Sequence, residues 1–353
     1  RRVGDVARVS VLSSVFASVL GVAALVIWGS SGLMIFVLAA PLASFLIGNI
    51  YIARLPKLRS PRTPLIQIAD QWRILARLGF AFMVAGLAGT LGQLLVRVAV
   101  QKQLGPDSLG YFHAAYTISV TYVSLVLGSM ASDYYSRVAA AIDDHAAVTR
   151  MINEQTEVVV LLAGPMVLFV MALTPCIVEI LYARNFQAAA TVLRFQLMGD
   201  ILKVCSWPLG IIIIASGQGR TFIGTEITGS AVYVLLTWLL LPVFGLAATG
   251  IAFFGMYLVY LPLTYFLVTR KMRISWERRI LVQLSTVFVL AALVFLIASW
   301  SKWYGASIGV AATAFLAVKG LVRIRQMTNL RGNSNRIAEY AQKIMKKIGV
   351  RHE

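Results

Sequence analysis

The sequence predicts an all-α integral membrane protein with about ten transmembrane helices, and three observations support this fold class. The 353 residues are 59% hydrophobic and 13% charged, with a mean hydropathy of +0.80. A soluble domain carries about 25% charged residues, so this chain cannot cover a water-exposed surface of ordinary size. The apolar residues fall in long blocks of about 20, the length that crosses a bilayer. Basic residues gather in alternate loops, as in multi-pass membrane proteins.

Ten apolar segments of this length follow one another along the chain. The predicted spans are 9–28, 33–52, 78–100, 111–131, 156–175, 187–215, 221–241, 246–268, 280–299 and 305–322. Since each is long enough to cross the hydrocarbon core as a helix, together they account for the apolar composition.

The placement of Lys and Arg predicts the direction of the spans. Of the 32 basic residues, 26 lie at the two ends of the chain and in one set of alternate loops. The opposite loops hold only Lys102, Arg184 and Lys302. Because cytoplasmic loops carry the excess of Lys and Arg, we expect both ends of this chain in the cytoplasm. The same placement explains the net charge of +18 without nucleic acid as a partner.

Composition shifts divide the chain further. The predicted segments are a helix pair at 1–52, a basic cytoplasmic linker at 53–77, a six-helix bundle at 78–270, two additional helices at 271–322 and a basic tail at 323–353. Three prolines fall in the linker, which favours a boundary there. In the tail, apolar residues recur at helical spacing between basic ones, which predicts an amphipathic helix on anionic inner-leaflet lipids. A solvated tail is the alternative.

Motifs that carry catalysis are scarce. The sequence has no phosphate-binding G-x-x-x-x-G-K-[ST] loop and no H-E-x-x-H zinc motif. Cys176 and Cys205 match no metal-ligand spacing, and we interpret them as two small buried thiols. We therefore predict no catalytic residue, no metal ion and no cofactor, so the chain is not expected to be an enzyme.

Polar residues at membrane depth are the candidate functional residues, since a charge near the bilayer centre costs about 2.5–3.5 kcal/mol on insertion scales. In the span 187–215, Gln196, Asp200, Lys203 and Trp207 share one helix face. Asp200 and Lys203 lie near the midplane. They could face a cavity, or they could neutralise each other as an i, i+3 pair, and the sequence leaves both interpretations open.

Two other spans carry polar faces. Gln93 and Arg97 share a face of 78–100, although Arg97 lies near the span end and could reach the interface instead. Thr117 and Thr121 share a face of 111–131, where hydroxyls often join neighbouring helices rather than bind a ligand. Glu226, inside the span 221–241, could pair with Arg220 or Lys203.

Three segments resemble a known family. They are LGPDSLGYF at 104–112, GSMASDYYSR at 128–137, and the stretch from LYARNF at 181–186 to GQG at 217–219. In this order and spacing they resemble the polysaccharide flippases of the multidrug/oligosaccharidyl-lipid/polysaccharide (MOP) exporter superfamily, and O-antigen translocases in particular. The resemblance is strongest over 75–270. One departure is Ser136, where relatives usually carry Pro.

The resemblance implies a fold of two six-helix bundles, often followed by two extra helices. The segment 78–270 would be the second bundle, 271–322 the extra pair and 1–52 the last two helices of the first bundle. About four N-terminal helices would then be absent from this chain, which opens with Arg1 rather than Met.

The resemblance also implies a function. Such proteins move undecaprenyl-pyrophosphate-linked oligosaccharide, such as an O-antigen repeat unit of lipopolysaccharide, across the bacterial inner membrane. Polysaccharide polymerase and chain-length machinery would be candidate partners. Alternatives are a cation-coupled multidrug exporter of the same superfamily, a non-transporting membrane partner in polysaccharide biosynthesis, and a membrane glycosyltransferase, which would need a larger outer loop.

From depth and helix face, we expect the cavity of such a transporter to include eight residues. The candidates are Arg97, Lys203, Arg194, Asp200, Gln93, Gln196, Thr117 and Thr121. Arg97 and Lys203 are the expected contacts of the charged head group, with Arg194 as a weaker candidate. Asp200 is expected to tune Lys203 or to couple transport to an ion.

Overall fold

The computed structural model describes residues 3–53, 65–182 and 184–347. These residues form helices joined by short turns, and no strand occurs among them. The chain divides into two compact units, Arg1–Trp72 and Arg73–Glu353.

The first unit contains a helical hairpin. Helix α1 (Val3–Trp28) and helix α2 (Leu33–Ala53) are joined by the short helix η1 (Gly29–Gly32). The small side chains of Ala17, Ala39 and Ala43 form its buried cluster, which lets the two helices approach closely. At Gly32 a Cβ atom would lie 2.3 Å from the Ala24 carbonyl oxygen, so only glycine fits at this end of the hairpin.

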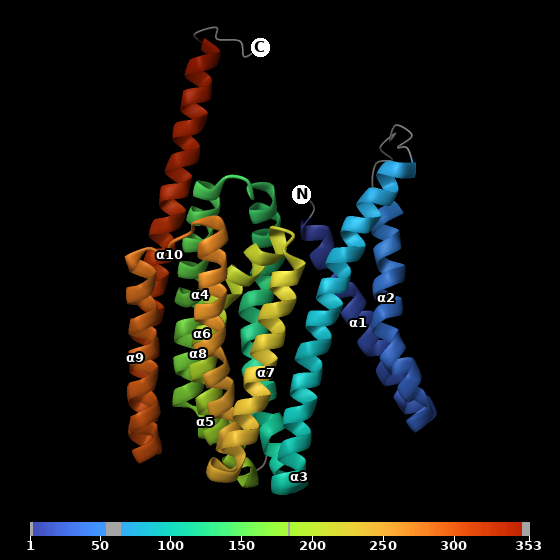
Figure 1. Cartoon of the computed structure of the whole chain (residues 1–353), viewed down its shortest axis with the longest axis vertical. Coiled ribbons are helices and arrows are strands. Elements are labelled where there is room, and N and C mark those ends of the chain that lie inside the picture. The colour runs from blue at the N-terminus through green and yellow to red at the C-terminus, as the bar shows by residue number, and fades with distance from the viewer. Residues whose placement is uncertain (1–2, 54–64, 183, 348–353) are drawn as a thin grey trace. The chain divides into compact units, whose positions relative to one another are not determined.

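The second unit is a helical bundle (Figure 1). Its elements are α3 (Leu65–Ala140) from Arg73 onward, α4 (His145–Ala172), α5 (Thr174–Leu181), η2 (Arg184–Phe186), α6 (Gln187–Ala215), α7 (Gly219–Phe244), α8 (Ala247–Met272), α9 (Arg278–Trp300) and α10 (Lys302–Lys347). Helix α6 is buried along most of its length and packs against α8 and α4. Cys205 on α6 is buried as expected, whereas Cys176 on α5 is exposed, so the expectation of a buried thiol is wrong for Cys176. Helices α9 and α10 pack on each other and on α4, so the core of the unit follows α6.

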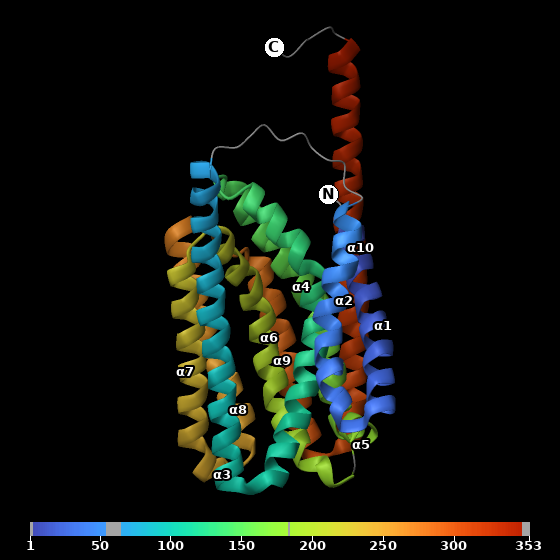
Figure 2. The same ribbon diagram turned by 90° about the vertical axis from the view of Figure 1, so that its right-hand side faces the viewer.

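Helix α3 reverses direction at Gly105. This residue has φ 84° and ψ 175°, a backbone conformation that glycine adopts without a steric penalty, and Pro106 follows it. The side chains of Gln93 and Tyr116, on opposite sides of the turn, form a hydrogen bond. The two arms of α3 therefore lie next to each other near the turn and diverge with distance from it (Figure 2), and they correspond to the predicted spans 78–100 and 111–131.

The described residues contain eight helical segments that are long and apolar enough to cross a membrane. Two of these segments, Arg8–Ala53 and Leu75–Gly128, each hold two helices. Each of the ten predicted spans therefore has a counterpart, and the predicted all-α membrane fold is confirmed.

Two helices extend beyond their predicted bounds. Helix α3 begins at Leu65, so the second half of the predicted linker 53–77 is helical, while residues 54–64 lie outside the described residues. Helix α10 continues without a break past 322 to Lys347 (Figure 1), since no proline interrupts the chain after Lys302. The side chains beyond Met327 are not among those described, so the amphipathic tail stays a prediction.

Gly250 allows α8 to approach α6 closely. A Cβ atom at position 250 would lie 2.6 Å from the Val192 carbonyl oxygen and 2.8 Å from the Phe195 Cβ. Because a backbone oxygen cannot turn aside, we expect Gly250→Ala to lower the free energy of unfolding by about 1–3 kcal/mol. Thermal unfolding of the detergent-purified protein measures this. Gly224→Ala in α7 is the matched control, since nothing lies within 4 Å of its Cβ position. Equal unfolding temperatures for the two variants would contradict the prediction.

Candidate functional site

Polar side chains from α3, α6, α7 and α8 line two cavities in the second unit. The first, here called the Lys203 cavity, has a volume of about 320 Å³ and is lined by α6, α7 and α8, with a contribution from α3. The second, the Arg97 cavity, has a volume of about 650 Å³ and lies between α3 and α7. Phe222 and Glu226 line both, so the two cavities adjoin.

Lys203 projects into its cavity from the middle of α6. Its side chain is 24% exposed, and its ammonium lies 5.7 Å from the centre of the Phe253 ring, where a cation–π interaction stabilises it. The rings of Trp207, Tyr257 and Tyr260 also line this cavity. The cavity therefore presents one cation among aromatic surfaces.

Asp200 lies behind Lys203 and is fully buried. Its Oδ2 accepts hydrogen bonds from the Ser119 hydroxyl at 2.7 Å and from the Tyr122 hydroxyl at 2.5 Å. Its Oδ1 lies 3.9 Å from the Lys203 Nζ, the outer limit of an ion pair. The second arm of α3 thus holds the carboxylate, and Lys203 keeps hydrogen-bond donors free to face the cavity.

Arg97 lines the other cavity and is positioned by two neighbours. Its Nη2 lies 3.5 Å from the Gln93 Oε1, and its guanidinium carbon lies 6.0 Å from the centre of the Tyr116 ring. The Gln93 amide nitrogen in turn donates to the Tyr116 hydroxyl. Tyr116 therefore connects the second arm of α3 to the arm that carries Arg97.

Glu226 accepts a hydrogen bond from the Tyr260 hydroxyl at 2.6 Å. This pairing replaces the Arg220 or Lys203 partner that the sequence suggested. Arg220 lies six residues earlier, in the first turn of α7, so its side chain leaves the helix in a different direction. The described linings of the two cavities hold Arg97, Lys203 and Glu226 as their charged groups, which leaves a net positive charge.

The other four candidates lie outside both linings. Arg194 is partly exposed on α6, and Gln196 is buried on the same helix, with no hydrogen-bond partner for its amide among the described residues. Thr117 and Thr121 are exposed on α3, where the Thr121 hydroxyl donates to the Thr117 carbonyl oxygen at 2.7 Å. Their roles stay predictions, while Gln93, Arg97 and Lys203 are brought to the cavities and Asp200 to the side of Lys203.

Sequence reasoning missed the hydroxyl groups of Ser119, Tyr116, Tyr122 and Tyr260. A signal was present, because tyrosines in membrane helices usually lie at the interface, whereas these lie well inside apolar segments. A buried tyrosine hydroxyl needs a partner, but the sequence does not say which helix supplies it.

Comparisons with known proteins agree with this architecture. A family model described as "Polysaccharide biosynthesis protein" matches residues 3–191, which includes the N-terminal helix pair as well as the first part of the region 75–270. Two curated relatives are both named lipid III flippase, one from Escherichia coli (strain K12) and one from Shigella flexneri. Each is 22% identical over 181 residues, which is 51% of this chain and 43% of the relative. The match thus spans less than half the length of these relatives.

A solved structure is similar in fold. It is that of the lipid II flippase MurJ in an inward closed conformation, which superposes with a TM-score of 0.59 over 89% of this chain and 67% of that chain. The sequence identity is 10%, so this similarity concerns the arrangement of helices alone.

Proposed function

The chain belongs to the polysaccharide biosynthesis protein family, and from this premise we propose that it moves a lipid-linked oligosaccharide across a membrane. The observation that carries the proposal is the pair of adjoining cavities inside the membrane-spanning bundle, each with one basic side chain, Lys203 or Arg97. The curated relatives bear the name of flippases, which supports transport rather than catalysis.

The chemistry of the cavities suits an anionic head that carries sugars. Arg recognises phosphate oxygens through paired hydrogen bonds, and Lys binds them as a point charge. Ser230 and the ring of Trp207 in the Lys203 cavity offer a hydroxyl group and a flat apolar surface to a sugar. Both cavity volumes, about 320 and 650 Å³, fall within or near the range of ligand pockets.

We propose undecaprenyl-pyrophosphate-linked oligosaccharide, such as an O-antigen repeat unit, as the substrate, and the bacterial inner membrane as the location. The prenyl chain would stay in lipid while the head passes along the two cavities. Rigid-body movement of helices around a fixed site would alternate its access to the two sides. Polysaccharide polymerase and chain-length proteins would receive the product.

Complementation tests this proposal. The 353-residue chain and a version extended upstream in its genome are expressed in a strain without its own O-antigen flippase, and in the native host with the gene deleted. We expect at least the extended version to restore the lipopolysaccharide ladder on a gel in the native host. Membrane abundance, measured by immunoblot, is the control.

The alternative of a cation-coupled multidrug exporter predicts a different result. Glu226 is the acidic residue that lines both cavities, and an exporter of cationic compounds would depend on it. Unrestored polymer in the native host, together with Glu226-dependent resistance to cationic dyes, would overturn the flippase proposal in favour of the exporter.

A further inference from the structure

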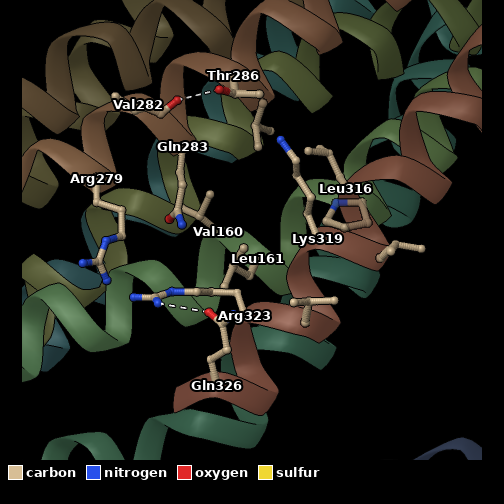
Figure 3. Close-up of a pocket in the computed structure, with 14 residues that line it drawn as sticks. Val160, Leu161, Arg279, Val282, Gln283, Thr286, Leu316, Lys319, Arg323 and Gln326 are labelled. Atoms are coloured by element: carbon tan, nitrogen blue, oxygen red, sulfur yellow. Dashed lines mark hydrogen bonds between the residues drawn. The ribbon is translucent and has the colours of Figure 1, made fainter. Parts of the chain in front are cut away.

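A third cavity lies on the other side of the bundle, between α4, α9 and α10. This groove has a volume of about 550 Å³, and none of its lining residues lines the Lys203 or Arg97 cavity. Figure 3 shows side chains from α9 and α10 converging on it. We call it the α9–α10 groove.

The groove is charged at one end and apolar at the other. Arg279 lies in the first turn of α9, and α10 runs in the opposite direction, so Arg323 and Gln326 lie at the same end (Figure 3). One turn deeper, about 6 Å along α10, lies Lys319. Beyond it the lining becomes apolar, with Val287 and Leu316. This polarity gradient matches that of a phospholipid.

The basic groups exceed their acidic partners. Arg323 forms an ion pair of 2.7 Å with Glu157, and Arg279 lies 3.6 Å from the same carboxylate. The ammonium of Lys319 lies 4.4 Å from the centre of the Phe315 ring. The lining as described holds three basic and no acidic side chains. The Glu157 carboxylate beside Arg279 and Arg323 offsets one of these charges, so an anion in this part of the groove would meet a net positive charge.

The groove opens toward lipid rather than toward the interior of the bundle. Val282, which lines it, is 56% exposed, and Val318 and Val322 of α10 are exposed beside it. An occupant must therefore reach the groove from the bilayer. Basic residues at such positions attract anionic lipids of the adjacent leaflet.

We propose that the α9–α10 groove binds an anionic glycerophospholipid, with its phosphate on Lys319 and Arg279 and one acyl chain along Val282 and Leu316. By the distribution of basic residues this lipid belongs to the cytoplasmic leaflet. The site does not depend on the proposed transport function, since it shares no lining residue with the two cavities.

Native mass spectrometry of the detergent-purified full chain tests the proposal. Phosphatidylglycerol and phosphatidylcholine with identical acyl chains are titrated, and the dissociation constant of the first bound lipid is measured. We expect tighter binding of phosphatidylglycerol. The double variant Lys319→Gln/Arg279→Gln should weaken it by roughly 25-fold, at about fivefold for each cation. Arg323 is left unchanged, because its loss would leave Glu157 with a weaker partner.

Two further variants distinguish a specific lipid-binding site from the general electrostatic attraction of anionic lipids to a basic protein surface. Val282→Trp fills the groove without changing its charge and should weaken phosphatidylglycerol binding several-fold. Arg220→Gln/Arg270→Gln removes two exposed cations from α7 and α8 and should change binding less than about twofold. Unfolding temperatures confirm that each variant is folded.

Three results would overturn the proposal. The first is equal affinity for the two phospholipids, and the second is unchanged phosphatidylglycerol binding in the Lys319→Gln/Arg279→Gln variant. The third is tighter binding of undecaprenyl phosphate than of phosphatidylglycerol, lost in the same variant, which would assign the groove to a polyprenyl lipid instead.

Discussion

Lys203→Ala is expected to abolish polymer export while the amount of protein in the membrane stays unchanged. Lys203 supplies the single cation of its cavity lining, and hydrogen bonds to charged groups contribute about 1.5–3 kcal/mol. Loss of this contact should reduce surface polymer at least about tenfold. Gel analysis of the polysaccharide, with an immunoblot of the membrane fraction, measures both quantities. The variants are made in whichever version of the gene, the 353-residue chain or the extended one, restores the polymer in the complementation test.

The same experiment can separate the two interpretations of Lys203. If the lysine only neutralises Asp200, 3.9 Å away, then the double variant Asp200→Asn/Lys203→Met should restore export, because it removes both charges. If Lys203 contacts the head group, the double variant should stay inactive, while Lys203→Arg keeps a phosphate-binding cation and should retain part of the activity.

Lys102→Ala is the matched control, since Lys102 is exposed near the turn of α3 and lines neither cavity. It should export normally. Normal polymer in Lys203→Ala, or restored polymer in the double variant, would rule out Lys203 as a head-group contact.

Composition and length were sufficient to predict the helices because a bilayer imposes one span length on every crossing. The turn between the third and fourth spans was also visible in the sequence, where Gly105 and Pro106 interrupt an apolar stretch. The start of α3 at Leu65 was not predicted. A helix of mixed polarity outside the lipid leaves no hydropathy signal.

The sequence predicted how deep in the membrane the site residues lie, but not which side chains pair with one another. The sequence placed Gln93, Arg97 and Lys203 inside the membrane, and the structure brings them to two adjoining cavities. On α3 the sequence drew attention to Thr117, whereas the structure turns Ser119 inward to Asp200. These residues are two positions apart, about 200° around the helix. Only the packing of neighbouring helices decides which of the two faces is buried.

Glu157 is a second case in which the sequence does not predict the partner of a buried side chain. It lies one residue inside the predicted span 156–175, and no basic residue stands three or four positions away, so its own helix cannot neutralise it. That absence predicts a distant partner but does not name it. The structure supplies Arg323 and Arg279 from the last two helices.

Arg323→Ala is therefore expected to destabilise the protein strongly. The Glu157 side chain is 6% exposed, and Arg323, 27% exposed, forms its 2.7 Å ion pair. Removing one partner of a buried pair costs about 3–5 kcal/mol. The loss here should be nearer about 2–3 kcal/mol, because Arg279 stays 3.6 Å away and Gln283 donates to the same carboxylate at 3.3 Å. Thermal unfolding in detergent measures it.

The charge itself, rather than lost packing of the long arginine side chain, is the expected cause. Adding Glu157→Gln to Arg323→Ala removes the buried charge and should recover most of the lost stability, since an unpaired carboxylate carries the main penalty. Arg150→Ala removes an exposed cation from α4, the helix that carries Glu157, and should change stability by less than about 0.5 kcal/mol. A double variant no more stable than Arg323→Ala would assign the effect to packing. If Arg323→Ala and Arg150→Ala have the same unfolding temperature, the ion pair does not stabilise the packing of α10 on α4. The apolar contacts between these helices are then sufficient to hold them together.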